Sequence, residues 1–196
     1  MVVAAGAGKR FGGLKQYEVA DGRRVLDWSV AAARTVAAGI VLVVPPERVA
    51  DPEKDVDLVV AGGATRSGSV RAGLAAVPAE ADVVVVHDAA RPWATPDLFR
   101  SVVAALAHAD GAVPGVPVTD TVKRVQDGRV LATLDRAELV AVQTPQAFRA
   151  DALRRGHASG ADATDDAALV EALGGVVVVV PGEPANVKIT RGADLS

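Results

Sequence analysis

The chain has 196 residues, of which half are hydrophobic and only 3% aromatic, and it carries a formal net charge of -3. This balance fits one globular domain and excludes a disordered polyelectrolyte, a basic nucleic-acid coat and an aromatic platform for single strands, so we expect no nucleic-acid partner. Cysteine is absent, which excludes disulfides and is compatible with a cytoplasmic setting, and no apolar run approaches the ~18 residues of a membrane helix, so we expect no membrane partner.

Short runs of β-branched residues alternate with helical stretches along the chain. The predicted strands are residues 1–4, 40–44, 57–61, 83–86, 111–116 and 176–180. Nearly continuous apolar runs of this kind are typical of strands that are covered on both faces. The predicted helices are residues 25–37, 66–76, 96–107, 151–158 and 165–173. The alternation favours an α/β fold with a doubly wound, mostly parallel, Rossmann-like sheet, which binds ligands at the carboxyl ends of its strands.

One segment, residues 121–134, interrupts this alternation. Asp127-Gly128 stands between two runs of alternating residues, which is a strong signal for a β-hairpin. A hairpin that projects from a parallel sheet exposes strand edges, and a second subunit can cover them. No linker or internal repeat divides the chain, so we expect one domain over residues 1–196 with a projecting arm at about residues 117–143.

A glycine-rich segment follows the first predicted strand and runs from Gly6 to Lys15. Backbone N–H groups of such a turn can approach phosphate oxygens, and Lys9, Arg10 and Lys15 can neutralise them. The segment is not a Walker A loop, because Arg10 follows Gly8-Lys9, and it is not a clean dinucleotide fingerprint, because its third glycine comes one position late. A tight turn with solvated charges is the alternative, but a turn alone does not need three cations.

A second glycine-containing cluster follows residues 57–61. Gly62 and Gly63 can let a base or a ribose lie against the backbone, with Ser69 as a polar contact. The alternative is an ordinary turn from strand to helix in which Thr65 caps the helix, and the cluster alone favours that alternative.

The most hydrophobic predicted strand leads directly into His87 and Asp88. Asp88 stands where open α/β sheets place carboxylates that bind a ligand or a metal. The alternatives are a structural ion pair between Asp88 and Arg91 and a His87 that is only a hydrogen-bonded core residue. The position at the end of the strand favours a functional role.

Later segments add cations and hydroxyl groups. Arg136, with Thr121 and Thr144, can grip a phosphomonoester, because arginine presents a fork of donors to an oxyanion. Solvated charge on a hairpin is the alternative for this group. Lys188 follows the last predicted strand and can supply a further cation. Thr164-Asp165-Asp166 precedes an apolar helix and predicts only a capped helix N-terminus.

Taken in order, these clusters resemble one family, the 2-C-methyl-D-erythritol 4-phosphate cytidylyltransferases of the non-mevalonate isoprenoid pathway. The resemblance covers nearly the whole chain. Its motifs are Ala4-Ala5-Gly6-x-Gly8-x-Arg10, Lys15-Gln16-Tyr17, Gly62-Gly63-x-x-Arg66-x-x-Ser69-Val70, Val86-His87-Asp88-Ala89-Ala90-Arg91-Pro92, Asp120-Thr121-x-Lys123-Arg124, Asp135-Arg136-x-x-Leu139, Gln143-Thr144-Pro145-Gln146, Thr164-Asp165-Asp166-Ala167 and Asn186-x-Lys188-Ile189-Thr190. Val3 and Leu14 stand where the family commonly has proline, and relatives usually continue through another helix after Ser196.

The resemblance implies a reaction of CTP with methylerythritol phosphate that yields CDP-methylerythritol and pyrophosphate, with Mg²⁺ bound mostly by the phosphates. It implies a catalytic role at the α-phosphorus for Arg10, Lys15 and Lys188. It implies that Asp88 positions Mg²⁺ or the ribose and that Arg91 holds the polyol. The remaining implied contacts are to the nucleotide, by Ala4, Ala5, Gly6, Gly8, Gly62, Gly63 and Ser69, and to the methylerythritol phosphate, by Thr121, Arg136 and Thr144. A homodimer in which the arm reaches across to the partner is implied as well.

The chemistry agrees with the residue types present. The attacking group would be the substrate's own phosphate, so the reaction needs alignment and positive charge rather than a nucleophile–base pair. Ribitol-5-phosphate cytidylyltransferase is the nearest alternative, followed by a nucleotidyltransferase for another sugar phosphate or nucleotide. A non-catalytic nucleotide-binding module is the alternative of a different class, and it does not require Arg10, Lys15, Asp88 and Lys188 together.

Overall fold

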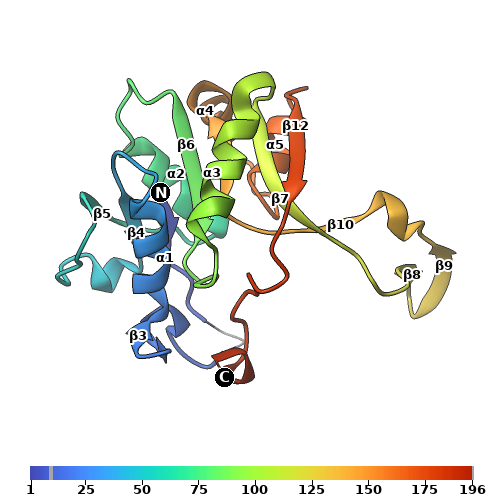
Figure 1. Ribbon diagram of the computed structural model, residues 1–196, viewed down its shortest axis with the longest axis horizontal. Coiled ribbons are helices and arrows are strands. Elements are labelled where there is room, and N and C mark those ends of the chain that lie inside the picture. Colours follow the sequence, from blue (N-terminus) through green and yellow to red (C-terminus); the bar gives the residue numbers. More distant parts are fainter. Residues whose placement is uncertain (9–10, 196) are drawn as a thin grey trace.

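The computed structural model describes residues 1–8 and 11–195, and its centre is a twisted sheet (Figure 1). Across the sheet lie, in order, β5 (Leu58–Ala61), β4 (Val41–Val44), β1 (Val2–Val3), β6 (Val83–Asp88), β11 (Gln146–Arg149) and β7 (Gly111–Pro117), and β7 also pairs with β10 (Val140–Val142) and β12 (Val177–Pro181). Strands β5, β4, β1 and β6 are parallel, and β12 is parallel to β7. Only β10 and β11 among these described strands run antiparallel to their neighbours. The predicted doubly wound, mostly parallel sheet is therefore confirmed.

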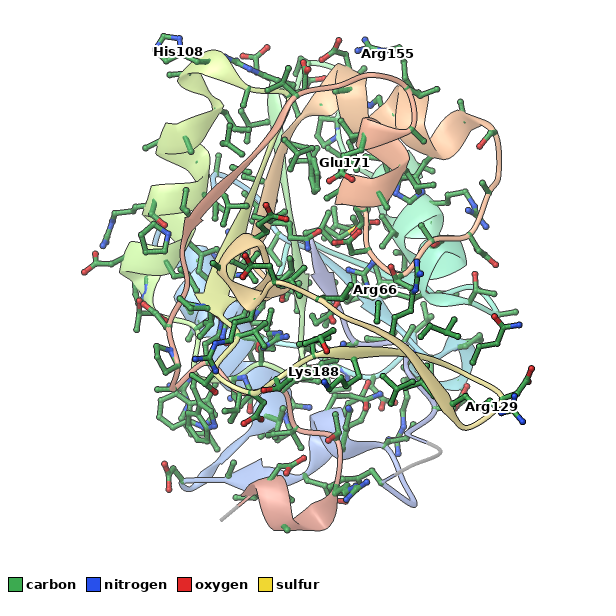
Figure 2. All side chains as sticks on the ribbon, turned by 90° about the vertical axis from the view of Figure 1, so that its right-hand side faces the viewer. Arg66, His108, Arg129, Arg155, Glu171 and Lys188 are labelled. Atoms are coloured by element: carbon green, nitrogen blue, oxygen red, sulfur yellow. The ribbon has the colours of Figure 1, made fainter. Side chains whose placement is uncertain are left out.

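The predicted hairpin is also present, and it projects from the body of the molecule as an arm (Figure 1). It consists of β8 (Lys123–Gln126) and β9 (Arg129–Thr133), joined by Asp127 and Gly128 with φ of 47° and 75°. Two consecutive positive φ angles are the geometry of the tight turn that suits a right-handed hairpin twist. Figure 2 views the molecule from the arm's side, with Arg129 labelled beside the turn.

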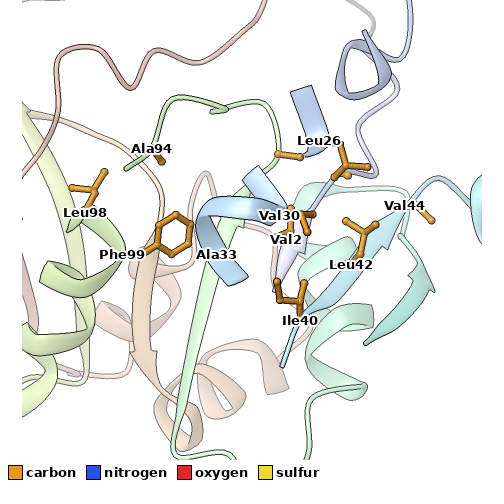
Figure 3. Close-up of a cluster of buried hydrophobic side chains, with 12 residues drawn as sticks. Val2, Leu26, Val30, Ala33, Ile40, Leu42, Val44, Ala94, Leu98 and Phe99 are labelled. Carbon is orange, nitrogen blue, oxygen red and sulfur yellow. The ribbon is translucent and has the colours of Figure 1, made fainter. Parts of the chain in front are cut away.

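Two hydrophobic cores cover the two faces of the sheet. Helices α1 (Val25–Arg34) and α3 (Pro96–Ala104) pack with β1 and β4 on one face, where Leu26, Phe99 and Leu42 are buried (Figure 3). Helices α2 (Arg66–Ala75), α4 (Ala150–Ala158) and α5 (Ala167–Glu171) pack on the other. Along β6, Val84 and Val86 belong to the second core and Val85 contacts the first. The continuous valine run in the sequence is explained by this burial on both faces.

Two helices begin with a side-chain cap. Thr65 accepts a hydrogen bond from Gly68 N at 2.9 Å at the start of α2, and Thr95 accepts one from Leu98 N at 3.2 Å at the start of α3. Short 3-10 helices connect the elements at Lys15–Tyr17, Pro46–Arg48, Ala105–His108, Arg136–Glu138 and Gly192–Leu195. Among the described residues, none of the helices combines the length and the apolar character needed to cross a lipid bilayer.

Four strands were not predicted. They are β2 (Val19–Ala20) and β3 (Arg23–Arg24), which form a small hairpin, and β10 and β11. The sequence of β11, Gln-Ala-Phe-Arg, contains no β-branched run and follows Pro145, which indicates a break. The strand nevertheless lies between β6 and β7 in the sheet, and Ala147 and Phe148 are fully inaccessible.

Candidate active site

A cleft of about 490 Å³ opens at the carboxyl ends of β1 and β6. Four segments contribute its lining: the loop after β1, the start of α2, the end of β6 and the segment that follows β12. The lining residues are Val3, Ala4, Ala5, Gly6, Ala7, Gly8, Phe11, Lys15, Gln16, Gly63, Ala64, Thr65, Arg66, Ser69, Asp88, Ala89, Ala90, Lys188 and Thr190. This is the edge at which open α/β sheets bind their ligands.

The glycine loop forms one wall of the cleft. Gly8 has φ of +60°, and its carbonyl oxygen accepts hydrogen bonds from Phe11 N and Gly12 N at 2.8 and 2.9 Å. A Cβ atom at Gly8 would lie 1.7 Å from the carbonyl oxygen of Gly13, so only glycine fits at this position.

The side chain of Gln16 fixes the start of this loop. It is buried, and its Nε2 donates to the carbonyl oxygens of Ala4 at 2.6 Å and Gly6 at 3.1 Å. These two acceptors would repel an incoming anion, and the amide engages both. Gln16 belongs to one of the sequence motifs, but no role was predicted for it, because no local signal distinguishes an amide that binds its own loop from an exposed one.

Two of the three predicted catalytic cations, Lys15 and Lys188, line the cleft. Lys15 donates from Nζ to the carbonyl oxygen of Ile189, which ties the loop after β1 to the segment after β12. Lys188, from that same segment, forms an ion pair with Asp88 at 2.5 Å. The third predicted cation, Arg10, lies outside the described residues.

Asp88 lies on the floor of the cleft between two cations. Its Oδ1 is 3.2 Å from the guanidinium of Arg66, and its Oδ2 is 2.5 Å from Lys188 Nζ. Burial by itself would raise the pKa of Asp88, but the charges of Arg66 and Lys188 outweigh it and hold that pKa well below its usual range. Arg66 is a site residue that sequence reasoning missed. Its signals were its place in the Gly62-to-Val70 motif and at the start of a helix after a glycine turn, and neither indicates a contact with Asp88.

Among the described residues that line the cleft, Asp88 is the only carboxylate, and no group of three or more acidic or histidine side chains is placed to hold a metal ion. A Mg²⁺ ion often takes one or two carboxylates and fills its other positions with phosphate oxygens and water. The donor set therefore fits a metal that arrives with a phosphorylated ligand, and it does not fit a resident metal held by protein alone.

The predicted nucleotide contacts divide into two groups. Six of them, Ala4, Ala5, Gly6, Gly8, Gly63 and Ser69, line the cleft. Gly62 is not among the lining residues and serves packing, because a Cβ atom there would lie 2.2 Å from the Cβ of Ala5. Ser69 donates to the carbonyl oxygen of Thr65 at 3.0 Å.

Arg91 and Thr144 lie behind the cleft, outside its lining. Arg91 donates to the carbonyl oxygens of Asn186 at 2.7 Å and Val142 at 3.4 Å. Thr144 is buried, and its hydroxyl oxygen lies 3.0 Å from Asp88 N, which donates to it, and 3.1 Å from Nδ1 of His87. Both side chains thus hold the frame of the site in this structure, and their predicted contacts with substrate stay predictions.

Thr121 and Arg136 belong to the exposed arm and do not line the cleft. Arg136 donates from its guanidinium to the carbonyl oxygen of Thr119, at the base of the arm. Their assignment to the phosphate of the acceptor also stays a prediction.

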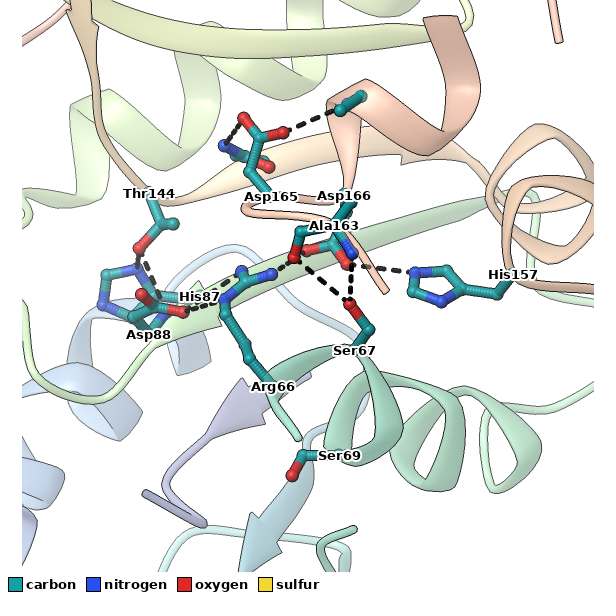
Figure 4. Close-up of polar contacts among 12 residues, drawn as sticks. Arg66, Ser67, Ser69, His87, Asp88, Thr144, His157, Ala163, Asp165 and Asp166 are labelled. Atoms are coloured by element: carbon teal, nitrogen blue, oxygen red, sulfur yellow. Dashed lines mark hydrogen bonds and ion pairs between the residues drawn. The ribbon is translucent and has the colours of Figure 1, made fainter. Parts of the chain in front are cut away.

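The capping interpretation of Asp165 and Asp166 is right for the first residue and wrong for the second. Asp165 accepts a hydrogen bond from Ala168 N at 3.1 Å, as a cap does. Asp166 is fully buried and makes no side-chain cap; it forms an ion pair with Arg66 at 3.0 Å, and its other oxygen lies 3.0 Å from Nε2 of His157 (Figure 4). Local sequence signals could not identify these partners, because Arg66 is distant in sequence and meets Asp166 only in the folded chain.

Comparisons with known proteins agree with this geometry. Over residues 1–196 the chain matches the sequence model of the family described as IspD, 2-C-methyl-D-erythritol 4-phosphate cytidylyltransferase. Over its whole length it is 43% identical to the bifunctional enzyme IspD/IspF of Solidesulfovibrio magneticus and 46% identical to that of Clavibacter michiganensis, of which it covers 55% and 52%. The chain thus spans about half the length of these curated relatives.

Solved structures are similar throughout the chain. The crystal structure of 2-C-methyl-D-erythritol 4-phosphate cytidylyltransferase from Thermus thermophilus is 38% identical with a TM-score of 0.84, and the match covers 99% of this chain and 93% of that one. The bifunctional IspDF of Campylobacter jejuni is 25% identical with a TM-score of 0.86, and the match covers 99% of this chain and 52% of that one.

Proposed function

The chain belongs to the 2-C-methyl-D-erythritol 4-phosphate cytidylyltransferase family, and from this we propose that it transfers a cytidylyl group from CTP to 2-C-methyl-D-erythritol 4-phosphate. An oxygen of the acceptor's phosphate attacks the α-phosphorus of CTP, the bond from that phosphorus to the bridging oxygen breaks, and pyrophosphate leaves. The observation that supports this most directly is the cleft, whose described lining brings Lys15 and Lys188 together with the glycines of the loop and one carboxylate, Asp88.

The glycine loop would bind the triphosphate. Its backbone N–H groups are the donors that phosphate oxygens prefer at a turn after a first strand. The lining by Ala4, Ala5, Gly63 and Ser69 leaves room for the nucleoside beside the start of α2. A single domain over residues 1–196 would carry this cleft, and the arm at about residues 117–143 would extend from that domain.

Lys15 and Lys188 would stabilise the negative charge that develops at the α-phosphorus. They reach the cleft from two different segments, so they can contact the phosphates from opposite sides. A fixed positive charge stabilises the charge of the transition state more strongly in a partly dehydrated site than it would in water. Arg10 is expected to act with them.

Mg²⁺ would be held by the phosphates of CTP, with one oxygen of Asp88 as the protein ligand, and bound there it would draw charge from the phosphate oxygens. Lys188 now occupies that carboxylate at 2.5 Å. Binding of the nucleotide would therefore exchange partners at Asp88, and Lys188 would move to the phosphates.

Thr121 and Arg136 would hold the phosphate of the acceptor from the arm of a second protomer. Both lie on the arm, outside the cleft lining of their own chain, which agrees with a role in a partner's site. We therefore propose a homodimer joined through the arm. Arg91 and Thr144 would shape the polyol end of each site indirectly, through their hydrogen bonds to the backbone of Asn186 and Asp88.

The proposal is tested by measuring pyrophosphate release from CTP and methylerythritol phosphate. We expect Lys15→Ala to lower kcat by about 100-fold or more, the loss typical for removal of a charge-stabilising group, and we expect the same direction for Arg10→Ala. Lys54→Ala, an exposed lysine away from the cleft, is the matched control and should turn over normally. Arg136→Ala should chiefly raise the KM for the acceptor.

Three outcomes would contradict the assignment. Unchanged turnover in Lys15→Ala and Arg10→Ala would refute their role. A higher kcat/KM with ribitol 5-phosphate would assign the chain to that polyol, and a preference for GTP or UTP over CTP would point to another nucleotidyltransferase.

A further inference from the structure

A row of polar side chains runs from α4 to the cleft, and Figure 4 shows it from His157 to Asp88. His157 on α4 is 3.0 Å from Asp166, Asp166 is 3.0 Å from Arg66, Arg66 is 3.2 Å from Asp88, and Asp88 is 2.5 Å from Lys188. Arg66 and Lys188 reach the cleft, whereas His157 and Asp166 do not line it. The row therefore connects the interior of the second core with the proposed nucleotide site.

Asp166 and His157 form the inner end of the row, and burying a carboxylate there costs free energy. Asp166 is 0% exposed and His157 is 4% exposed. Taking a carboxylate out of water costs several kcal/mol, and an ion pair regains that cost only partly, so an apolar pair of similar volume would often be at least as stable. Stability alone is therefore a weak explanation for this arrangement.

What the inner end does is fix the direction of one guanidinium. Arg66 presents its Nε and one terminal nitrogen to Asp88 and its other terminal nitrogen to Asp166. Because the guanidinium group is planar, contacts on two sides define its orientation. His157 contacts the second oxygen of Asp166 and so keeps that carboxylate turned toward Arg66.

The two cations on Asp88 differ in the number of carboxylates that contact them and in exposure. Arg66 is held by a second carboxylate, and 24% of its side chain is exposed; Lys188 contacts Asp88 at the cleft surface, and 36% of its side chain is exposed. When an anion enters the cleft, Lys188 can leave Asp88 only if that buried carboxylate keeps another counterion, because an unpaired buried charge is strongly unfavourable.

We propose that Asp166, supported by His157, is a positioning residue that holds Arg66 as the permanent counterion of Asp88 and so frees Lys188 to move to the phosphates. The part of this proposal that concerns turnover rests on the proposed function. The part that concerns Arg66 can be tested on the protein without any substrate.

The first experiment compares two adjacent carboxylates. Asp166→Asn removes the charge that faces Arg66, and Asp165→Asn, on the same turn, removes a charge that caps the helix and contacts Gln146. We expect Asp166→Asn to lower kcat by roughly 10- to 100-fold, the loss typical when a catalytic group is misplaced, with the KM for CTP changed by less than about threefold. Asp165→Asn should keep its kcat. Both variants are assayed at a temperature where circular dichroism shows them folded.

A double-mutant cycle tells positioning from a general structural effect. If Asp166 acts through Arg66, Asp166→Asn should cause no further loss of kcat in an Arg66→Gln background, since coupled residues are not additive. Additive losses, or an equal loss of kcat in Asp165→Asn, would overturn the proposal. So would an Asp166→Asn variant whose kcat stays within about twofold of the wild type.

The second experiment needs no turnover. In the substrate-free protein, the Nε–H resonance of Arg66 should exchange slowly with water, and it should lose this protection in Asp166→Asn but not in Asp165→Asn. A resonance that stays protected in Asp166→Asn would refute the positioning role. If the wild type released no pyrophosphate from CTP and methylerythritol phosphate, the proposed function would fail while this measurement still decided the role of Asp166.

Discussion

The imidazole ring of His87 joins three backbone segments beneath the cleft. Its Nε2 lies 3.2 Å from the carbonyl oxygen of Arg91, and its Nδ1 lies 3.1 Å from the hydroxyl of Thr144. A carbonyl oxygen can only accept, so Nε2 carries the proton. Nδ1 then accepts from Thr144, whose oxygen in turn accepts from Asp88 N. This chain of donors works only with a neutral ring.

The neutral ring predicts how stability depends on pH. Burial lowers the pKa of His87 from 6.5 to about 4. The unfolded chain takes up this proton near pH 6.5 and the folded protein only near pH 4, so the contribution of His87 is complete above pH 6.5 and is lost as the pH falls toward 4. The shift corresponds to about 3 kcal/mol of unfolding free energy. Urea denaturation at stepped pH should show this loss in the wild type.

Two variants isolate the contribution of His87. His87→Gln should flatten the profile between pH 6.5 and 4. His108→Gln changes an exposed histidine and should keep the wild-type profile. Equal profiles for the wild type and His87→Gln would show that another group causes the pH dependence.

The position of a residue in the cleft was predictable when that residue followed a predicted strand. Lys15, Asp88 and Lys188 fall in polar clusters at strand ends, and the sheet brings such clusters to one edge. Arg66 and Asp166 were not predictable as a pair. Each has a satisfactory local interpretation, as a helix start and a cap, and only the packing of α5 beside α2 makes them partners.

At the scale of elements, the glycine loop contains a position, Gly8, that tolerates no side chain. Gly8 combines φ of +60° with a close approach to the backbone of Gly13, whereas a Cβ atom at Gly13 would meet nothing within 4 Å. The loop thus offers a matched pair of glycines with different constraints.

We expect Gly8→Ala to disturb the loop and Gly13→Ala to leave it intact. The added methyl group at Gly8 collides with backbone, so the turn must open and its donors must separate. Affinity for CTP, measured by isothermal titration calorimetry, should fall by about tenfold or more in Gly8→Ala, which corresponds to at least about 1.4 kcal/mol. Equal affinities in the two variants would show that the turn does not organise the nucleotide site.

Element types were predictable wherever burial left a pattern. The valine runs of β6 and β12 and the Asp-Gly turn of the arm each carry a local signature. Strand β11 has no local signature of a strand. It forms because the chain pairs with both β6 and β7, and its buried residues there are an alanine and a phenylalanine. Its antiparallel direction follows from chain topology, which no window of sequence contains.

At the scale of the whole molecule, the arm exposes apolar surface on a narrow two-stranded ribbon. Val125 pairs with Val130, so both side chains lie on one face of the hairpin, where they are 53% and 62% exposed. An isolated two-stranded hairpin is marginally stable in water. Cover from a second protomer would stabilise it, as the proposed homodimer requires.

A charge on that face should separate the protomers. We expect the wild type to sediment as a dimer and Val130→Asp to sediment as a monomer at the same micromolar concentration, because the carboxylate would be buried in the interface. Val19→Asp places the same charge on a valine that is 63% exposed outside the arm, and it should remain dimeric. A monomeric wild type would contradict the proposed assembly.

The double pairing of Arg66 has a consequence for how the sequence can change over time. Replacing Arg66 alone removes a partner from both Asp88 and Asp166, and replacing Asp166 alone removes one partner of Arg66 and the acceptor of His157. A single substitution in this row therefore disturbs more than one contact, and we expect substitutions here to be tolerated best when the partners change together.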